Sequence, residues 1–267
     1  MSDAQTVHTA TTELFQYEPP KAAYGTARIL VKPNLGYPVG PPVTVSMGVL
    51  SAVLQGLRRV SPTAEILIVE GVCSAVSLTD IASRNGLYNL LDEGMQLLDA
   101  DQLPLRDYPN LSPQPVRFQS MTAPALLSEV DCCISVGAFK RTILKDQPLI
   151  SASLKNLYGL FPRPKYKARS ANSRGQLHRP SVPLVLQDVY FSIGHLFHGA
   201  VVDGDRKFLS RDWKPDKGES VQLGQIFWGD DMLSVDRRAC EVGNEATPSY
   251  LNEIECLRRL QLGNPSL

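Results

Sequence analysis

Basic side chains are concentrated in one part of the sequence. Between residues 140 and 179 a single acid, Asp146, stands against ten basic residues: Lys140, Arg141, Lys145, Lys155, Arg163, Lys165, Lys167, Arg169, Arg174 and Arg179. Clustered ammonium and guanidinium groups commonly neutralise carboxylate and phosphate groups in proteins. The cluster therefore predicts a site for a small anionic ligand, although a solvated basic face would give the same pattern.

Two lysines stand within otherwise apolar runs. Lys32 lies in residues 29–35 and Lys155 in residues 154–160. A buried ammonium is costly unless it is paired, so both need a carboxylate or a bound anion nearby. A desolvated lysine can also lose its proton near neutral pH and act as a base or as a Schiff-base nucleophile. We expect one cleft whose substrate-binding residues are Lys32, Asn34, Lys140, Arg141, Asn156 and Tyr158.

Carboxylates follow several predicted strands. Glu70 follows residues 66–69, Asp203 follows 200–202, and Asp230 and Asp231 follow 225–228. Ligands gather at the carboxyl ends of strands in open α/β sheets, so these groups could hold a divalent metal or form an acid–base pair. Each could equally fix a turn or cap a helix, as Asp203-Gly204 and Gly229-Asp230 suggest.

One histidine lies inside the basic stretch. His178 precedes Arg179 and could be a general acid or base within an anion pocket. Together with the lysine and carboxylates above, the candidate catalytic residues are Lys155, Glu70, Asp203 and His178.

Several enzyme classes lack their motifs. The sequence has no Gly-x-Ser-x-Gly elbow, no phosphate-binding P-loop and no Gly-x-Gly-x-x-Gly. An acid–base lyase, isomerase or cyclase therefore fits better than a serine hydrolase or an NAD-dependent dehydrogenase. The five cysteines form no Cys-x-x-Cys, so neither a disulfide framework nor an iron–sulfur cluster is expected. No cofactor is evident.

Short β-like runs alternate with helical periods. Strands are predicted at residues 28–35, 65–70, 131–136, 199–202 and 225–228, and amphipathic helices at 47–60, 186–197 and 247–257. This alternation predicts an α/β fold, with a mostly parallel or mixed sheet and helices on both faces.

The predicted organisation is one domain with two flanking features. We expect an N-terminal extension at residues 1–26 and a single α/β domain at 27–260, with a loop at 103–115. Residues 162–183 hold four prolines and six basic residues and little that could pack, which predicts a mobile lid over the anion site.

Composition also limits the partners. The net charge is zero, and a dedicated nucleic-acid or polybasic membrane binder usually has a positive balance. No run approaches eighteen apolar residues, and the N-terminus lacks the layout of a signal peptide, so we expect a cytoplasmic protein without a membrane partner. A homo-oligomer is compatible with the sequence. Tyr158, Phe161 and Tyr166 lie between basic residues and could stack on bases.

A series of motifs resembles a known family over roughly residues 27–260. The motifs are, in chain order, Val31-Lys32-Pro33-Asn34, Thr44 before a helix, Val69-Glu70-Gly71, residues 153–159 (SLKNLYG), His178, Val202-Asp203-Gly204, and Gly229-Asp230-Asp231 followed by Ser234-Val235-Asp236. In order and spacing they resemble the domain of unknown function 362. That resemblance implies a bacterial or archaeal α/β protein, often associated with iron–sulfur proteins. This chain departs from it in lacking cluster-binding cysteines, and it has Lys140-Arg141-Thr142 where the family often shows Lys-Thr-His.

These observations predict an enzyme of small-molecule metabolism, such as a biosynthetic enzyme, that acts on a carboxylate- or phosphate-bearing substrate. One alternative is a non-catalytic accessory protein that handles a cofactor or a metal. The other is a protein that binds single-stranded nucleic acid.

Overall fold

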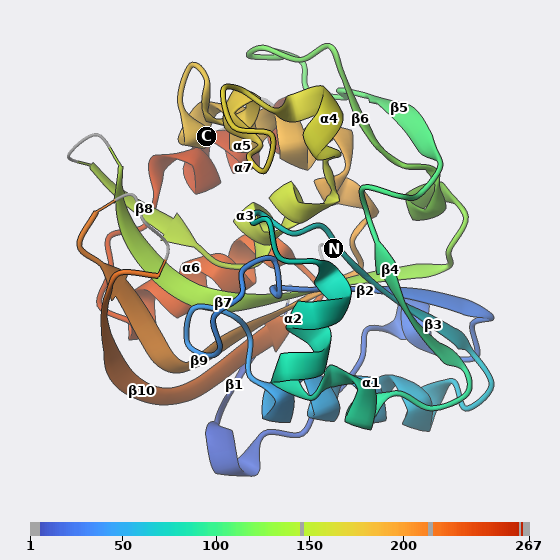
Figure 1. Ribbon diagram of the computed structural model, residues 1–267. Helices are drawn as coiled ribbons and strands as arrows, with labels where there is room; N and C mark the ends of the chain where they lie inside the picture. Colours follow the sequence, from blue (N-terminus) through green and yellow to red (C-terminus); the bar gives the residue numbers. More distant parts are fainter. Residues whose placement is uncertain (1–5, 145–146, 213–215, 262, 264–267) are drawn as a thin grey trace.

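A mixed sheet of eight strands forms the centre of the molecule (Figure 1). The structure is a computed structural model that describes residues 6–144, 147–212, 216–261 and 263. The strands are β1 (Val7–Thr11), β2 (Arg28–Pro33), β3 (Glu65–Glu70), β4 (Met95–Asp99), β7 (Cys132–Leu144), β8 (Gln147–Ser151), β9 (Gly199–Ser210) and β10 (Gly218–Gly229). Their order is β1-β10-β9-β7-β2-β3-β4, and β8 pairs with β7. The pairs among β4, β3, β2, β7 and β9 are parallel, and β1, β8 and β10 pair antiparallel.

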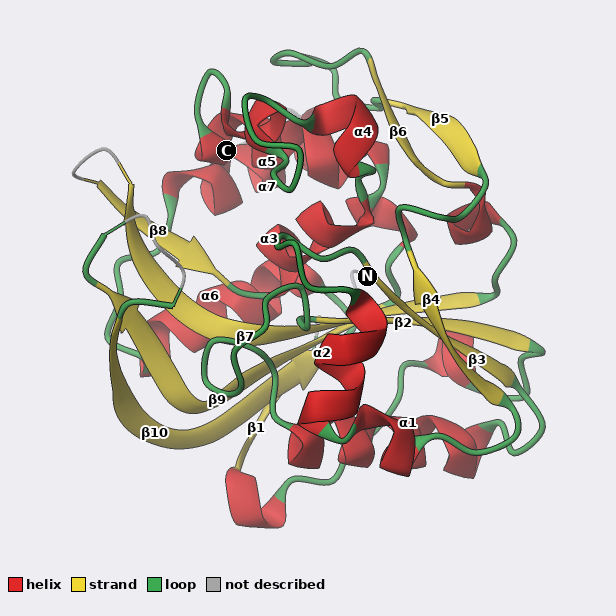
Figure 2. Ribbon diagram, viewed as in Figure 1, coloured by secondary structure: helices red, strands yellow, loops and turns green. Residues whose placement is uncertain are grey.

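Helices cover both faces of this sheet (Figure 2). On one face lies α1 (Met47–Val60), with α2 (Leu78–Asn85) nearby; on the other lie α5 (Val182–Ser192), α6 (Met232–Val242) and α7 (Ser249–Gln261). Successive residues of β2 point to opposite faces. Ile29 and Val31 pack in the core beneath α1, whereas Leu30 packs in the core beneath α5 and α7. The predicted α/β class is therefore confirmed.

The remaining elements are short. Two α-helices of one turn are α3 (Ser153–Asn156) and α4 (Arg163–Tyr166), and β5 (Leu105–Pro109) pairs with β6 (Ser120–Pro124) in a separate two-stranded sheet. The 3-10 turns are Thr12–Leu14, Lys21–Ala23, Leu87–Leu90, Ala125–Ser128, Leu157–Leu160, Gly175–His178 and Gly194–Leu196. No described helix combines the length and the apolar composition needed to cross a membrane.

The strongest sequence signals give the observed boundaries. The helix predicted at residues 47–60 is α1, which buries the stripe from Val49 to Leu57 and begins where the Ser46 side chain accepts a hydrogen bond from the Val49 amide. The strand predicted at residues 65–70 is β3. Both segments carry an uninterrupted apolar pattern that matches one secondary structure only.

Other boundaries differ from the prediction. β7 and β9 continue to Leu144 and Ser210, because their second halves, which mix basic and apolar residues, go on pairing with β8 and β10. The helix predicted at 186–197 begins earlier, at Val182, and ends at Ser192, where Ile193 leaves the helical conformation and a 3-10 turn follows. Within the predicted loop at 103–115, residues 105–109 form β5.

The segment predicted to be an N-terminal extension contributes to the domain. Residues 7–11 form β1, which pairs antiparallel with β10 at the edge of the main sheet. Phe15, Tyr17 and Ala23 are buried in the core beneath α1. The alternation in β1 is too weakly apolar to be recognised as a strand, which explains why the sequence pattern misses it.

Residues 162–183 have more structure than their composition predicts. They contain α4 and the 3-10 turn at residues 175–178, and Tyr166, Arg174 and Leu177 are buried. Arg174 fastens the segment through hydrogen bonds from its guanidinium group to the backbone oxygens of Phe161 and Val72. The segment is therefore packed against the ends of the strands that carry the candidate site.

Candidate functional site

A cavity of about 290 Å³ opens where the strand order reverses. From β2 the chain adds β3 and β4 on one side and then β7 and β9 on the other, so β2 and β7 flank a topological switch point. Ligands in open α/β sheets bind in the crevice outside the carboxyl ends of the strands at such a point. Eight of the ten residues predicted to form the catalytic and substrate-binding site line this cavity: Lys32, Asn34, Glu70, Lys140, Lys155, Asn156, Tyr158 and His178.

Lys32 and Glu70 form a buried ion pair at the base of the cavity. The Lys32 Nζ and Glu70 Oε1 atoms are 2.7 Å apart, and both side chains are almost completely buried. The two Glu70 oxygens also accept hydrogen bonds from the backbone amides of Leu35 and Gly71, at 2.7 and 2.8 Å. Burial lowers the pKa of Lys32, and the Glu70 carboxylate opposes that effect. Both oxygens of the Glu70 carboxylate therefore already have partners within the protein, and Lys32 balances its charge.

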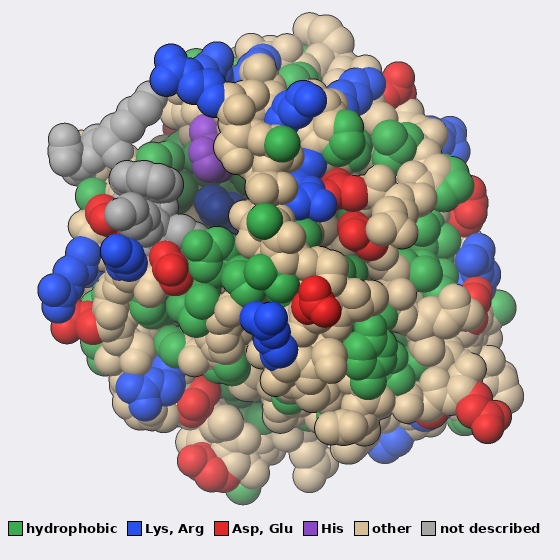
Figure 3. All heavy atoms as spheres, viewed as in Figure 1, with side chains coloured by type: hydrophobic (Ala, Val, Ile, Leu, Met, Phe, Trp, Pro, Cys, Tyr) green, Lys and Arg blue, Asp and Glu red, His purple; other side chains and the backbone are tan. Residues whose placement is uncertain are grey.

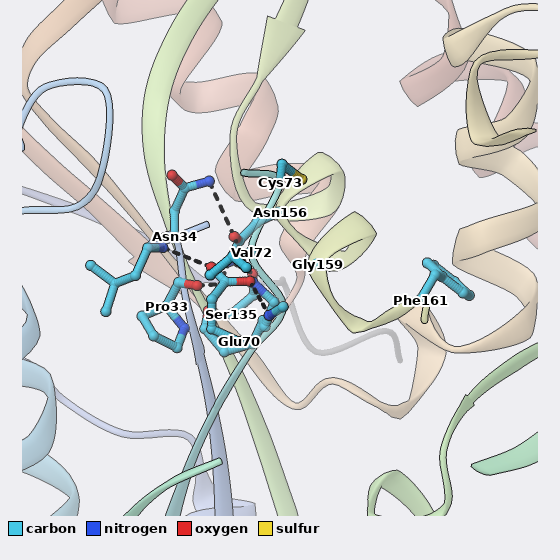
Figure 4. A network of polar contacts seen from close by, with 12 residues as sticks. Pro33, Asn34, Glu70, Val72, Cys73, Ser135, Asn156, Gly159 and Phe161 are labelled. Carbon is cyan, nitrogen blue, oxygen red and sulfur yellow. Dashed lines mark hydrogen bonds and ion pairs between the residues drawn. The ribbon is translucent and has the colours of Figure 1, made fainter. Parts of the chain in front are cut away.

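Two asparagines connect Lys32 to Lys140 through hydrogen bonds. The Asn156 Oδ1 atom accepts from Lys32 Nζ at 3.1 Å and from Asn34 Nδ2 at 3.3 Å. The Asn34 Oδ1 atom accepts from Lys140 Nζ at 3.0 Å, and the backbone oxygen of Val43 accepts from the same amine at 2.6 Å. Figure 4 shows the Asn34 and Asn156 side chains pointing toward each other above Glu70. This network fixes the position of each amine.

Lys155 differs from the other two lysines. Within the part of the chain that the structure describes, its ammonium makes no hydrogen bond or ion pair, and it lies 5.2 Å from the centroid of the Tyr158 ring. Desolvation lowers the pKa of Lys155. Its charge also lowers the pKa of Lys140, which desolvation and this neighbour together bring to about 7. Lys155 is therefore available to contact a ligand, and Lys140 has a pKa close to neutral pH.

His178 lies at the rim of the cavity. Its ring stacks on Tyr158 with centroids 6.1 Å apart, and desolvation followed by the charge of Lys155 lowers its pKa. This shift favours the neutral form of the imidazole. Figure 3 shows a hollow on this face of the molecule with a basic side chain deep inside it and a histidine beside it.

Close backbone packing holds the turn after Asn156 against the buried ion pair. A methyl group at residue 159 would overlap the Glu70 carboxylate and lie 2.8 Å from Lys32 Nζ, so only glycine fits there. This contact accounts for the Gly159 that ends the Ser-Leu-Lys-Asn-Leu-Tyr-Gly motif.

Asp236 anchors the short helix that carries Lys155 and Asn156. Its carboxylate, on α6, is fully buried and accepts hydrogen bonds from the Ser153 and Leu154 amides at 2.8 and 3.0 Å. Burial raises the pKa of Asp236 to about 6, and the hydrogen bonds from Ser153 and Leu154 oppose the rise. An acceptor at the start of α3 compensates for the lack of intrahelical partners there.

The other predicted carboxylates lie elsewhere. Asp203 accepts from the Ser46 amide at 2.9 Å before α1, outside the described lining of the cavity. Asp231 caps α6 and pairs with Arg258, and with Asp230 it lines a separate cavity of about 670 Å³. Among the described residues, no group of three or more His, Cys, Asp or Glu side chains could hold a metal ion. The structure thus does not bring Glu70, Asp203, Asp230 and Asp231 together.

Arg141 and the aromatic residues also depart from the expected arrangement. Arg141 follows Lys140 on β7, so its side chain points to the other face, where it lies 3.8 Å from Glu245. Tyr158, Phe161 and Tyr166 are buried, with exposed fractions of 7%, 0% and 4%. They pack in the core, so the proposed stacking of these rings on bases has no support in the structure.

The motifs that form the site lie within the region that matches a known protein family. The family described as Domain of unknown function (DUF362) matches residues 29–241, which include β2, β3, β7 and the turn at Gly159. The chain belongs to the DUF362 family. A comparison with curated proteins finds no match.

One solved structure supports the fold of this DUF362 chain. The lactate racemase apoprotein from Thermoanaerobacterium thermosaccharolyticum is similar to it with a TM-score of 0.53 and 14% sequence identity. The similarity covers 85% of this chain and 52% of that one, so the DUF362 chain spans about half the length of the racemase. At this identity the likeness concerns the fold alone.

Some residues of the DUF362 site carry no sequence signal that singles them out. Tyr37, Cys73 and Arg174 line the cavity, and the Arg174 guanidinium donates to the Cys73 sulfur at 3.1 Å. Gly36 and Tyr37 directly follow the Lys-Pro-Asn motif, and Cys73 follows Glu70-Gly71 by two residues, so extending each motif would have found them. Arg174 would not have been found in this way, because it adjoins neither motif and is brought to the site by hydrogen bonds to the backbone oxygens of Phe161 and Val72.

Proposed function

We propose that this DUF362 protein is an enzyme that binds a small carboxylate- or phosphate-bearing substrate in the cavity and transfers a proton on it. One observation carries the proposal. Four cationic side chains line the cavity, and the carboxylate that lies among them, Glu70, is already held by Lys32 and two backbone amides. An uncompensated ammonium near low-dielectric walls attracts an anion strongly.

The roles of the lysines follow from their contacts. Lys155, half-buried and without an acceptor among the described residues, is the contact for the anionic group of the substrate. Lys140 is the proton-transferring group, because its pKa of about 7 allows it to give and take a proton at neutral pH. Glu70, Asn34 and Asn156 position these amines. The lactate racemase of similar fold acts, as its name says, on a small carboxylate, which belongs to the same class of molecule.

Binding is tested first with simple anions. Inorganic phosphate and lactate are titrated into the purified protein at low ionic strength and pH 7 by calorimetry, with uncharged lactamide as the control ligand. We expect one site for an anion and none for lactamide. Lys155→Met should weaken binding about tenfold or more, whereas Lys165→Met, which removes an exposed lysine of α4 outside the cavity, should not.

Catalysis is tested by proton exchange. Lactate is incubated with the protein in D₂O, and proton NMR follows exchange of the hydrogen on the carbon next to its carboxylate. Hydrogen exchange that is lost when Lys140 is replaced supports the proposal that the protein is an enzyme. Lactate that binds tightly but shows no exchange favours the non-catalytic accessory protein, and failure of both phosphate and lactate to bind contradicts the proposal.

A further inference from the structure

Lys140 has an arrangement that proton transfer alone does not require. Its Nζ atom donates to two fixed oxygens, Asn34 Oδ1 at 3.0 Å and the Val43 backbone oxygen at 2.6 Å. A neutral amine has two hydrogens and one lone pair. When both hydrogens are donated to these oxygens, the lone pair is directed away from them. Since Lys140 lines the cavity, a bound molecule can approach it there.

Desolvation, helped by charged neighbours, lowers the pKa of Lys140 and favours its neutral form. The side chain is 8% exposed, and the described residues offer its ammonium no carboxylate at ion-pair distance. Lys155 and Lys32 lower its pKa, and Glu70 and Cys73 raise it, with desolvation the largest effect. Placing a second cation beside a desolvated lysine is a known way to activate it as a nucleophile.

The two lysines then have separate tasks. Lys155 lies over the Tyr158 ring, a contact that favours a positive charge, and its ammonium has no acceptor among the described residues, so it can hold an anionic group while Lys140 presents a neutral amine. A substrate with both an anionic group and a carbonyl group would engage both lysines at once.

We propose that Lys140 forms an imine with the carbonyl carbon of a small 2-oxo acid or a similar carbonyl-bearing anion, which Lys155 holds by its charge. In this step Nζ forms a double bond to the carbonyl carbon. The carbonyl oxygen leaves as water with the two hydrogens of the amine, so no oxidant or reductant takes part. The inference rests on the proposed function, because it names the substrate class of the same cavity.

Trapping with borohydride tests the imine. The full-length protein is incubated with pyruvate and sodium borohydride, and the reduced adduct is weighed by intact mass spectrometry and located by peptide mapping. We expect one adduct per chain, on Lys140. Lactate, which lacks a carbonyl, should compete, and acetone, which lacks the charge, should be trapped at least tenfold less well.

Variants separate the two roles. Lys140→Arg keeps a positive charge but cannot form the imine, so trapping should be lost. Lys155→Met should reduce trapping and shift its pH profile upward, because the charge that lowers the pKa of Lys140 is gone. Lys165→Met should trap pyruvate like the wild type.

The outcomes distinguish the two proposals. If phosphate or lactate binds but pyruvate is not trapped, or is trapped on Lys155 or on surface lysines, the imine is overturned and the anion site stands. If neither anion binds, the proposed function fails together with the imine. A single saturable adduct on Lys140 supports both.

Discussion

The Lys32 ammonium and the Glu70 carboxylate lie 2.7 Å apart on the neighbouring parallel strands β2 and β3, and both side chains are almost fully removed from water. Such a pair adds little net stability over an apolar pair of the same volume, but removing one partner leaves the other as an uncompensated buried charge. Its value here is positional, because the pair and Asn156 fix the base of the cavity.

Removing one partner of this pair should be costly. We expect Glu70→Gln to lower the free energy of unfolding by about 3 kcal/mol or more, because Lys32 would stay buried without its counter-ion. Glu65→Gln is the matched control on the same strand. Its partner Arg28 is 37% exposed, so that change should cost less than about 1 kcal/mol. Urea unfolding measures both, and equal losses would contradict the assigned role of Glu70.

Lys155 should behave in the opposite way. Because its ammonium makes no ion pair among the described residues, we expect Lys155→Met to change the free energy of unfolding by no more than about 1 kcal/mol. Anion binding should nevertheless weaken about tenfold or more. Thermal melts with and without phosphate measure the two effects together. A large drop in the melting temperature without ligand would show that Lys155 has a structural partner instead.

Lys140 should make stability depend on pH. Its pKa is lowered from 10.5 to about 7 in the folded chain, so between these values the unfolded chain holds a proton that the folded chain has lost. Stability contributed by this group therefore rises with pH above about 7, by at most about 1.4 kcal/mol per pH unit. Unfolding of wild type and Lys140→Met at pH 7, 8 and 9 isolates the effect, and a difference that stays constant with pH would refute it.

Asp236 should stabilise the helix α3 that carries two residues of the site. Asp236→Ala leaves the Ser153 and Leu154 amides without their buried acceptor, and we expect a loss of about 2 kcal/mol. Anion affinity should fall as well, because α3 carries Lys155 and Asn156. The control is Asp230→Ala, which removes an exposed carboxylate just before α6. It should change neither the stability nor the anion affinity. If Asp236→Ala bound the anion with unchanged affinity, the position of α3 would not matter for anion binding.

The predicted lid can be examined by limited proteolysis. Arg169 is exposed and Arg174 is buried, so trypsin should cut after Arg169 before it cuts after Arg174. If residues 162–183 close over a bound anion, phosphate should slow that cut in proportion to its binding. Equal cleavage with and without phosphate, at concentrations that saturate the site, would favour a fixed structural segment.

The sequence predicts the site better where polar residues interrupt apolar runs. Lys32, Asn34, Lys155 and Asn156 stand in such runs, and the cavity joins them. Asp203 and Asp231 also follow strands, but each satisfies a helix end, and a carboxylate after a strand looks the same in either role. Arg141 is adjacent to Lys140 in the sequence, but neighbours on a strand point to opposite faces of the sheet, so the two side chains separate.

The edge strand β1 has a consequence for handling the protein. Its five residues, Val7–Thr11, occupy the hydrogen-bonding edge of β10, a strand twelve residues long. Truncation through Thr11 would uncover a row of backbone donors and acceptors able to pair with a second chain. A shortened protein would therefore be prone to edge-to-edge aggregation while keeping every residue of the cavity. Loss of solubility after such a deletion would report on that uncovered edge and not on the substrate site.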